Sequence, residues 1–157
     1  MLDATTFRTA LGRLASGVSV VTTVGPDGRD HGITVTALCS VSLQPPLLLV
    51  CIERSATIHA PLASATHFAV NVLAREQETL SRRFAETAGD KFRDIAAARG
   101  VHGCALLDDA LAHIECARWA EYDGGDHTIF VGRAMRAEIR DAHPLLYYRG
   151  GYAGLDA

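Results

Sequence analysis

The 157-residue chain contains a single lysine, Lys91, so arginine supplies almost all of its positive charge. Its formal net charge is −3 and no run of basic residues occurs, which argues against nucleic acid as a partner. No apolar stretch approaches the roughly 20 residues that a membrane-spanning helix needs, so no membrane partner is expected either. The N-terminal residues also lack the charged-then-apolar order of a signal peptide, and we expect a cytoplasmic protein.

Metal and disulfide signatures are missing as well. The four cysteines form no CxxC pair, and the histidines show neither an HExxH arrangement nor any other ligand spacing. Most of the cysteines fall within apolar, strand-like segments. Buried free thiols in a reducing compartment are therefore favoured over disulfides, and no metal site is expected.

The GxGxxG turn and the regularly alternating crossover helices of a doubly wound dinucleotide-binding fold are absent. Short segments rich in β-branched and apolar residues follow one another instead. They lie at residues 18–24, 31–36, 47–52, 67–73, 111–120 and 128–139. Strands in hairpin order with short helices between them predict one mainly β domain over residues 1–157, a closed or nearly closed antiparallel barrel.

Three further features refine this prediction. Helical spacing of apolar residues predicts an N-terminal helix capped by Thr5 or Thr6, and further helices over 57–63 and 76–85. The uninterrupted apolar run at 47–52 predicts a strand buried on both faces. Residues 86–103 are polar and interrupted by glycine, so we expect a surface excursion with little regular structure.

Residues 32–57 are the most informative segment. The first part is rich in small and hydroxylated residues, which leave backbone N–H groups accessible to a flat polar ligand. An apolar strand follows and ends in the turn Glu53-Arg54-Ser55-Ala56-Thr57, where a guanidinium and two hydroxyls can hold a phosphate. The pair of features indicates a nucleotide-like cofactor, with FMN and FAD as leading candidates. A threonine-rich strand followed by a helix capped by Ser55 explains the same pattern.

Two other segments are candidates for ligand binding. His127 follows a Gly-Gly-Asp turn at the start of a predicted strand, a place where loops often carry function. In the C-terminal tail, Gly151 allows close approach to a ligand, and Tyr147 and Tyr152 can stack on a flat ring. The structural alternatives are a turn histidine bonded to Asp126 and a tail strand that packs on a second subunit.

Five segments, in this order, resemble the flavin reductase-like family: FRTALGRLASGVSVVTT, HGITVTALCSVSLQPPLLLVCI, FAVNVLAREQETLSRRFA, GGDHTIFVGR and PLLYYRGGYAGL. The resemblance covers roughly residues 5–155. Members are the small reductase components of two-component flavin-dependent monooxygenases. The resemblance implies a split β-barrel of the FMN-binding type, a homodimer, and reduction of FMN or FAD by NADH or NADPH. The reduced flavin then passes to a separate monooxygenase.

The resemblance also implies roles for individual residues. The flavin-binding residues would be Gly32, Thr34, Val35, Thr36, Ala37, Ser40, Val41, Glu53, Arg54, Ser55, Ala56, Thr57, Arg83 and Phe84. The nicotinamide-binding residues would be His127, Tyr147, Gly151 and Tyr152, with His127 positioning the nicotinamide. No metal takes part.

Three other functions fit parts of the sequence. A flavin carrier or redox sensor would bind flavin without oxidising NADH or NADPH. An oxidase of the pyridoxamine-phosphate type would need more basic residues than a one-lysine chain offers and lacks the Gly-Asp-His match. A barrel that binds only a protein partner would need no cofactor. The residues leave the choices between FMN and FAD, and between NADH and NADPH, open.

Overall fold

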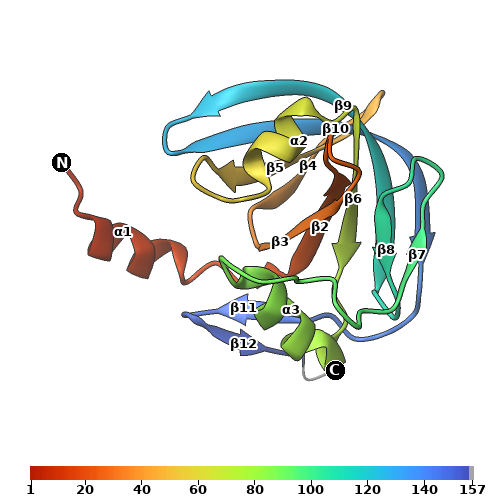
Figure 1. Ribbon diagram of the computed structural model, residues 1–157. Coiled ribbons are helices and arrows are strands. Elements are labelled where there is room, and N and C mark those ends of the chain that lie inside the picture. The colour runs from red at the N-terminus through yellow and green to blue at the C-terminus, as the bar shows by residue number, and fades with distance from the viewer. Residues whose placement is uncertain (156–157) are drawn as a thin grey trace.

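A computed structural model describes residues 1–155 (Figure 1). Its main element is a seven-stranded antiparallel sheet with the order β3-β2-β6-β9-β10-β5-β4. The strands are β2 (Ser19–Val24), β3 (Asp30–Val35), β4 (Leu38–Leu43), β5 (Pro46–Glu53), β6 (His67–Val72), β9 (Ala112–Gly124) and β10 (His127–Ile139). The sheet curls around a core, and its edge strands β3 and β4 are not paired with each other. The predicted antiparallel barrel is confirmed, with an open seam between β3 and β4.

Short elements surround this sheet. The helices are α1 (Ala4–Leu11), α2 (His59–Ser64), the 3-10 turn η1 (Arg75–Gln77) and α3 (Glu78–Ala85). The short strands are β1 (Ser16–Gly17), β11 (Leu146–Tyr148) and β12 (Gly151–Ala153) in one small sheet, and β7 (Ala97–Arg99) and β8 (Ala105–Leu107) in another. Figure 1 shows α1 projecting away from the sheet, whereas α3 lies beside the β11–β12 hairpin. In the described part of the chain, no helix is long and apolar enough to cross a membrane.

Two large buried clusters and a small third one, Ala69, Cys104 and Leu106, form the core of the described residues. The larger one lies within the curled sheet and contains Val21, Val35, Leu48, Val50, Ile52, Ile58, Leu62, Phe68, Val70, Cys116 and Phe130. The second lies under α3 and contains Val18, Val20, Leu73, Phe84, Leu107 and Leu145. Successive residues of a strand point to opposite faces, so β2 contributes Val21 to the first cluster and Val20 to the second. The second cluster therefore anchors α3 to the sheet.

The structure corrects three local predictions. Asp3, rather than Thr5 or Thr6, caps α1, because its carboxylate accepts a hydrogen bond from the Thr6 backbone N–H at 2.9 Å. Strand β5 is not buried on both faces: Leu48, Val50 and Ile52 point inward, while the alternate residues Leu47, Leu49 and Cys51 are partly exposed. The β9–β10 turn is shorter than expected, because β9 extends to Gly124 and β10 begins at His127.

The cysteines agree only in part with the prediction. All four are free thiols, and Cys104 and Cys116 are buried. Cys51 is partly exposed and Cys39 is exposed, so not every strand cysteine belongs to the core. Burial raises the pKa of Cys104 to about 11 and that of Cys116 to about 12.

Candidate functional site

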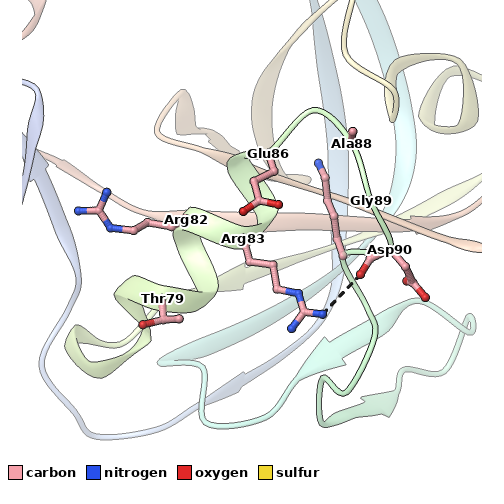
Figure 2. A pocket seen from close by; sticks show the side chains of 8 residues that line it. Thr79, Arg82, Arg83, Glu86, Ala88, Gly89 and Asp90 are labelled. Atoms are coloured by element: carbon pink, nitrogen blue, oxygen red, sulfur yellow. Dashed lines mark hydrogen bonds between the residues drawn. The ribbon is translucent and has the colours of Figure 1, made fainter.

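A groove curves around helix α3 in three connected clefts. The first, of about 850 Å³, lies between the start of β3, Thr57 and the loop of residues 87–92. The second, of about 460 Å³, lies between that loop and α3 (Figure 2). The third, of about 320 Å³, lies between α3 and the β11–β12 hairpin. Neighbouring clefts share lining residues, so the three lie next to one another around the helix and the loop.

The amphipathic sequence of α3 explains why one face of the helix packs on the sheet while another lines the groove. Ser81 and Phe84 are fully buried against the sheet, whereas Arg82 and Arg83 lie on the groove side (Figure 2). Arg83 donates to the backbone oxygens of Asp90 and Arg93, which ties the loop to the helix. Arg83, a predicted flavin residue, lines the second cleft. The side chain of Phe84 is fully buried, so it can only support a ligand site from beneath.

Strand β3 and α3 touch through a glycine. A Cβ atom on Gly32 would lie 2.6 Å from Cε1 of Phe84 and 3.1 Å from Cζ of Phe92. The two phenylalanine rings meet edge to face, with centroids 5.0 Å apart. Next to this contact, the Thr34 hydroxyl donates to the backbone oxygen of Ser81 at 2.6 Å. The predicted flavin residues Gly32 and Thr34 are thus placed directly against α3.

Lys91 is a candidate that sequence reasoning missed. Its ammonium donates to the backbone oxygens of Gly32, at 3.2 Å, and Phe84, at 3.1 Å, and the residue lines two of the clefts. Burial lowers the pKa of Lys91, and the nearby Glu86 carboxylate opposes this effect. Within residues 1–155 the ammonium has no ion-pair partner. A half-buried cation held only by neutral carbonyls favours an anionic group in the groove. The one signal available beforehand was its status as the only lysine.

The β11–β12 hairpin forms the far wall of the groove. Its two-residue turn, Arg149-Gly150, has positive φ at both positions, which suits a tight hairpin. The Tyr152 ring lies under the Arg82 guanidinium, 4.8 Å from its centroid, and meets the Tyr147 ring edge to face. Tyr147, Tyr152 and the half-buried Gly151 all line the third cleft, as their predicted role requires.

The turn after β5 makes internal contacts that the sequence did not reveal. The Arg54 guanidinium donates to Asp123 at 2.7 Å and to the backbone oxygen of Gly125 at 3.1 Å. Hydrogen bonding to Arg54 holds the pKa of Asp123 below its usual range. The Ser55 hydroxyl donates to Glu53. Arg54 therefore fastens the turn to the β9–β10 hairpin, and Ser55 makes a bond within the turn. Their predicted phosphate contact would have to compete with these bonds.

The capping alternative for Ser55 is wrong. Helix α2 begins at His59, four residues later, and its N-cap Ile58 makes no side-chain bond. Ala56 is partly buried and Thr57 is exposed. Thr57 lines the first cleft, and the other four residues of this turn line none of the three. Thr57 therefore joins the turn to the groove.

His127 stands at the start of β10, opposite Glu53. Its Nδ1 lies 2.7 Å from the Asp126 carboxylate, so the structural alternative for this histidine holds. That hydrogen bond lowers the pKa of Asp126. The side chain keeps 40% of its surface exposed. Its fixed orientation and exposed ring are compatible with contact to a ligand.

The remaining predicted flavin residues divide by burial. Thr36, Ala37, Ser40 and Val41 are exposed along the β4 edge of the seam, while Val35 is buried in the core. An edge strand presents unpaired backbone N–H and C=O groups, which a flat polar ring can use. Val35 can offer only its backbone.

The four predicted nicotinamide residues are not assembled within one chain. His127 belongs to the seven-stranded sheet, and Tyr147, Gly151 and Tyr152 belong to the three-stranded one. No hydrogen bond, ring contact or shared cleft in the described residues joins His127 to the other three. Residues 1–155 also contain no group of three or more His, Cys, Asp or Glu side chains suited to a metal ion.

Comparison with known proteins gives consistent results. The flavin reductase-like domain matches residues 11–156. A flavin reductase (NADH) of Kitasatospora aureofaciens is 44% identical over 98% of this chain and 82% of its own. The reductase component of a 4-nitrophenol 4-monooxygenase/4-nitrocatechol 2-monooxygenase of Rhodococcus opacus is 38% identical over 96% of this chain and 80% of its own.

Solved structures agree with the fold. The NADH:FAD oxidoreductase SgcE6 of Streptomyces globisporus, in complex with NAD and FAD fragments, superposes with a TM-score of 0.91 at 37% identity. The match covers 96% of this chain and 92% of that one. The flavin reductase PheA2 superposes with a TM-score of 0.92 at 36% identity, over 99% of this chain and 100% of its own. With a family match across nearly all of its length, the chain belongs to the flavin reductase-like family.

Proposed function

We propose that this chain is a flavin reductase, which transfers hydride from NADH to FMN or FAD and releases the reduced flavin to a separate flavin-dependent monooxygenase. The observation that carries the proposal is the groove around α3. In a chain of this family, the groove places the flavin segment of β3 and the aromatic hairpin against the same short helix. Relatives named as NADH-dependent flavin reductases and monooxygenase reductase components support the reaction and the partner.

Bound nicotinamide and flavin would supply the hydride donor and acceptor, so the chemistry belongs to the cofactors. The chain's own residues need only bind both rings, align them and exclude water. Alignment with reacting atoms about 3–3.5 Å apart accounts for a large share of such catalysis. No nucleophile, acid or base of the chain is required.

On the flavin side, the open seam between β3 and β4 suits the ring. Backbone N–H groups near Thr36–Ser40 would stabilise negative charge that develops on the polar edge of the ring. Lys91, Arg83 and Thr57 line the clefts beyond the seam and would hold the phosphate. The predicted phosphate site also includes Arg54, Ser55 and the backbone of Glu53 and Ala56, in the turn that follows β5.

On the donor side, we assign the nicotinamide to His127, Tyr147, Gly151 and Tyr152. Aromatic rings and a glycine backbone suit the flat, uncharged ring of reduced nicotinamide and its carboxamide group. His127 then positions the ring through its exposed edge, while Asp126 fixes the imidazole. Within the described residues of one chain, no hydrogen bond, ring contact or cleft joins His127 to the hairpin, so we infer that two subunits build each site.

A homodimer is further supported by the outer face of the main sheet. Residues directly opposite each other in neighbouring strands share one face. Leu49 lies between Cys39 and Val131, and Cys51 lies opposite Ile129. In this patch Cys39 is exposed, Leu49, Cys51 and Ile129 are partly exposed, and Val131 is buried, and apolar surface patches of this kind mark interaction surfaces. A two-fold dimer through this face would bury it.

The four free cysteines fit a reducing compartment, and we place the protein in the cytoplasm. We also propose that residues 1–157 act as one domain. A carrier or sensor that binds flavin without oxidising NADH is the competing function. It predicts tight flavin retention and negligible NADH oxidation when free flavin is in excess.

The test is oxidation of NADH and NADPH with FMN, FAD and riboflavin in turn. We expect rapid oxidation of NADH that depends on added flavin, and a lack of turnover with every pair would refute the reductase function. The variant His127→Ala should raise the KM for NADH far more than the flavin Kd. His143→Ala, an exposed histidine outside the groove, serves as the matched control. An unchanged KM for NADH in His127→Ala would contradict the role of His127.

A further inference from the structure

Ser81 is a buried polar residue in the middle of α3 that sequence reasoning did not select. Its side chain has no exposed surface. Serine is a weak helix former, and a buried hydroxyl needs a hydrogen-bond partner. Its Oγ lies 2.7 Å from the Tyr152 hydroxyl. Ser81 therefore connects α3 to the β11–β12 hairpin.

The same residue also contacts the flavin segment. Its backbone oxygen accepts the Thr34 hydroxyl at 2.6 Å. Thr34 and Tyr152 are far apart in the sequence and come from different sheets, yet both bond to Ser81. One residue thus sets the position of the predicted flavin strand relative to the predicted nicotinamide hairpin.

The hairpin is also attached at its base, where the backbone of the buried Leu145 bonds to Val18 and Leu73. Strand β11 pairs with β1 at only two positions, and the Arg149 N–H donates to the backbone oxygen of Gly12. Arg82 covers the Tyr152 ring, but its guanidinium is also held by Glu78 at 2.7 Å. The Tyr152 ring also packs against the second core cluster, and the Ser81 hydroxyl contacts its phenol directly, which restrains the ring from the α3 side.

We infer that Ser81 is a positioning residue for hydride transfer, which holds Tyr152 at a set distance from the β3 strand. This inference rests on the proposed reductase function and on the assignment of the hairpin to the nicotinamide. Hydride transfer is sensitive to displacement of the two rings, because the reacting atoms must be aligned. Loss of the Ser81–Tyr152 bond would therefore weaken productive NADH binding and leave the flavin in place.

The variant Ser81→Ala removes the hydroxyl but keeps the backbone oxygen that Thr34 uses. We expect its KM for NADH to rise about threefold to tenfold, the range for a lost neutral hydrogen bond, with the flavin Kd unchanged. Thr34→Val should show the reverse pattern, a higher flavin Kd with little change in the KM for NADH. Thr34→Ser should behave as the wild type. Ser64→Ala, an exposed serine of α2, is the neutral control.

A second variant removes the same bond from the other side. Tyr152→Phe should raise the KM for NADH as Ser81→Ala does, and the double variant should rise no further than either single one. This variant also decides the matter if Ser81→Ala fails to fold. Equal KM values for Tyr152→Phe and the wild type would overturn the inference.

A measurement on the protein without flavin or NADH separates the two proposals. Both Ser81→Ala and Tyr152→Phe should speed hydrogen exchange of backbone amides in the hairpin, from Leu146 to Ala153, and leave β9 and β10 unchanged. Wild-type protein that fails to oxidise NADH would refute the reductase function. Wild-type turnover together with unchanged hairpin exchange and KM in both variants would refute the positioning role alone.

Discussion

Gly32→Ala is the sharpest test of how the site is built. The new Cβ atom would lie 2.6 and 2.8 Å from two carbons of the Phe84 ring, well inside normal contact. Phe84 is fully buried in the second core cluster, so its ring cannot swing into open space. Overpacking of this kind costs about 1–3 kcal/mol. Replacing a strand glycine returns roughly 0.5–1 kcal/mol, because the unfolded chain loses freedom. We expect a net loss of roughly 0.5–2 kcal/mol.

For a chain of this size, that loss lowers the melting temperature by roughly 2–6 °C, measured by circular dichroism. Gly17→Ala is the matched control, because a Cβ atom there meets nothing within 4 Å and β1 is also a strand. The double variant Gly32→Ala/Phe84→Leu should recover part of the loss by making room. If Gly32→Ala melts at the temperature of Gly17→Ala, the tight β3–α3 contact is not real. Since Gly32 lies in the flavin segment, the flavin Kd of Gly32→Ala should also rise.

Two other predictions concern charge. Lys91→Met should weaken FMN binding about tenfold or more, the range for a lost bond to a charged group, and leave riboflavin binding unchanged; equal losses for both flavins in a binding titration would contradict a phosphate contact. Burial, and to a lesser degree the charge of the stacked His102, lowers the pKa of His67 below its ordinary 6.5, while Glu115 opposes the shift. Above 6.5 both the folded and unfolded states keep His67 neutral; below it the unfolded chain gains a proton that the folded chain resists, so stability falls as the pH drops. His67→Phe should flatten this acid-side loss in urea unfolding, and an unaltered pH dependence would refute the assignment.

The barrel could be predicted from the sequence because its cues are local. Runs of β-branched residues and the turns between them mark the strands, and their hairpin order allows few arrangements. The exposed alternate positions of β5, such as Leu49 and Cys51, could not be predicted, because no local cue in the sequence marks them. An apolar residue on the outer face of a sheet looks the same in sequence as one facing the core.

The site was harder to predict, because its decisive contacts join distant residues. The sequence predicts Arg54 as a phosphate ligand, whereas in the folded chain its guanidinium donates to Asp123, almost seventy positions later. Lys91 carries no motif, and only the folded chain shows that its ammonium reaches two carbonyls and, among residues 1–155, no carboxylate. Val35 was grouped with its exposed neighbours, although strand alternation turns its side chain into the core.

The central role of α3 has a consequence for which residues the function depends on. A helix of eight residues is not stable alone. Contacts with the rest of the fold must therefore hold α3, namely the packing of its Phe84 ring on Gly32 and the hydrogen bonds of Ser81. Side chains that would touch flavin or NADH, such as Arg83, are positioned by this buried layer. Substitutions in the layer should therefore change ligand affinity through geometry, even though none of its side chains reaches the groove surface. If substitutions at Gly32 or Ser81 lower ligand affinity while the barrel stays folded, then the affinity of the groove depends on the buried residues beneath it as much as on the residues that line it.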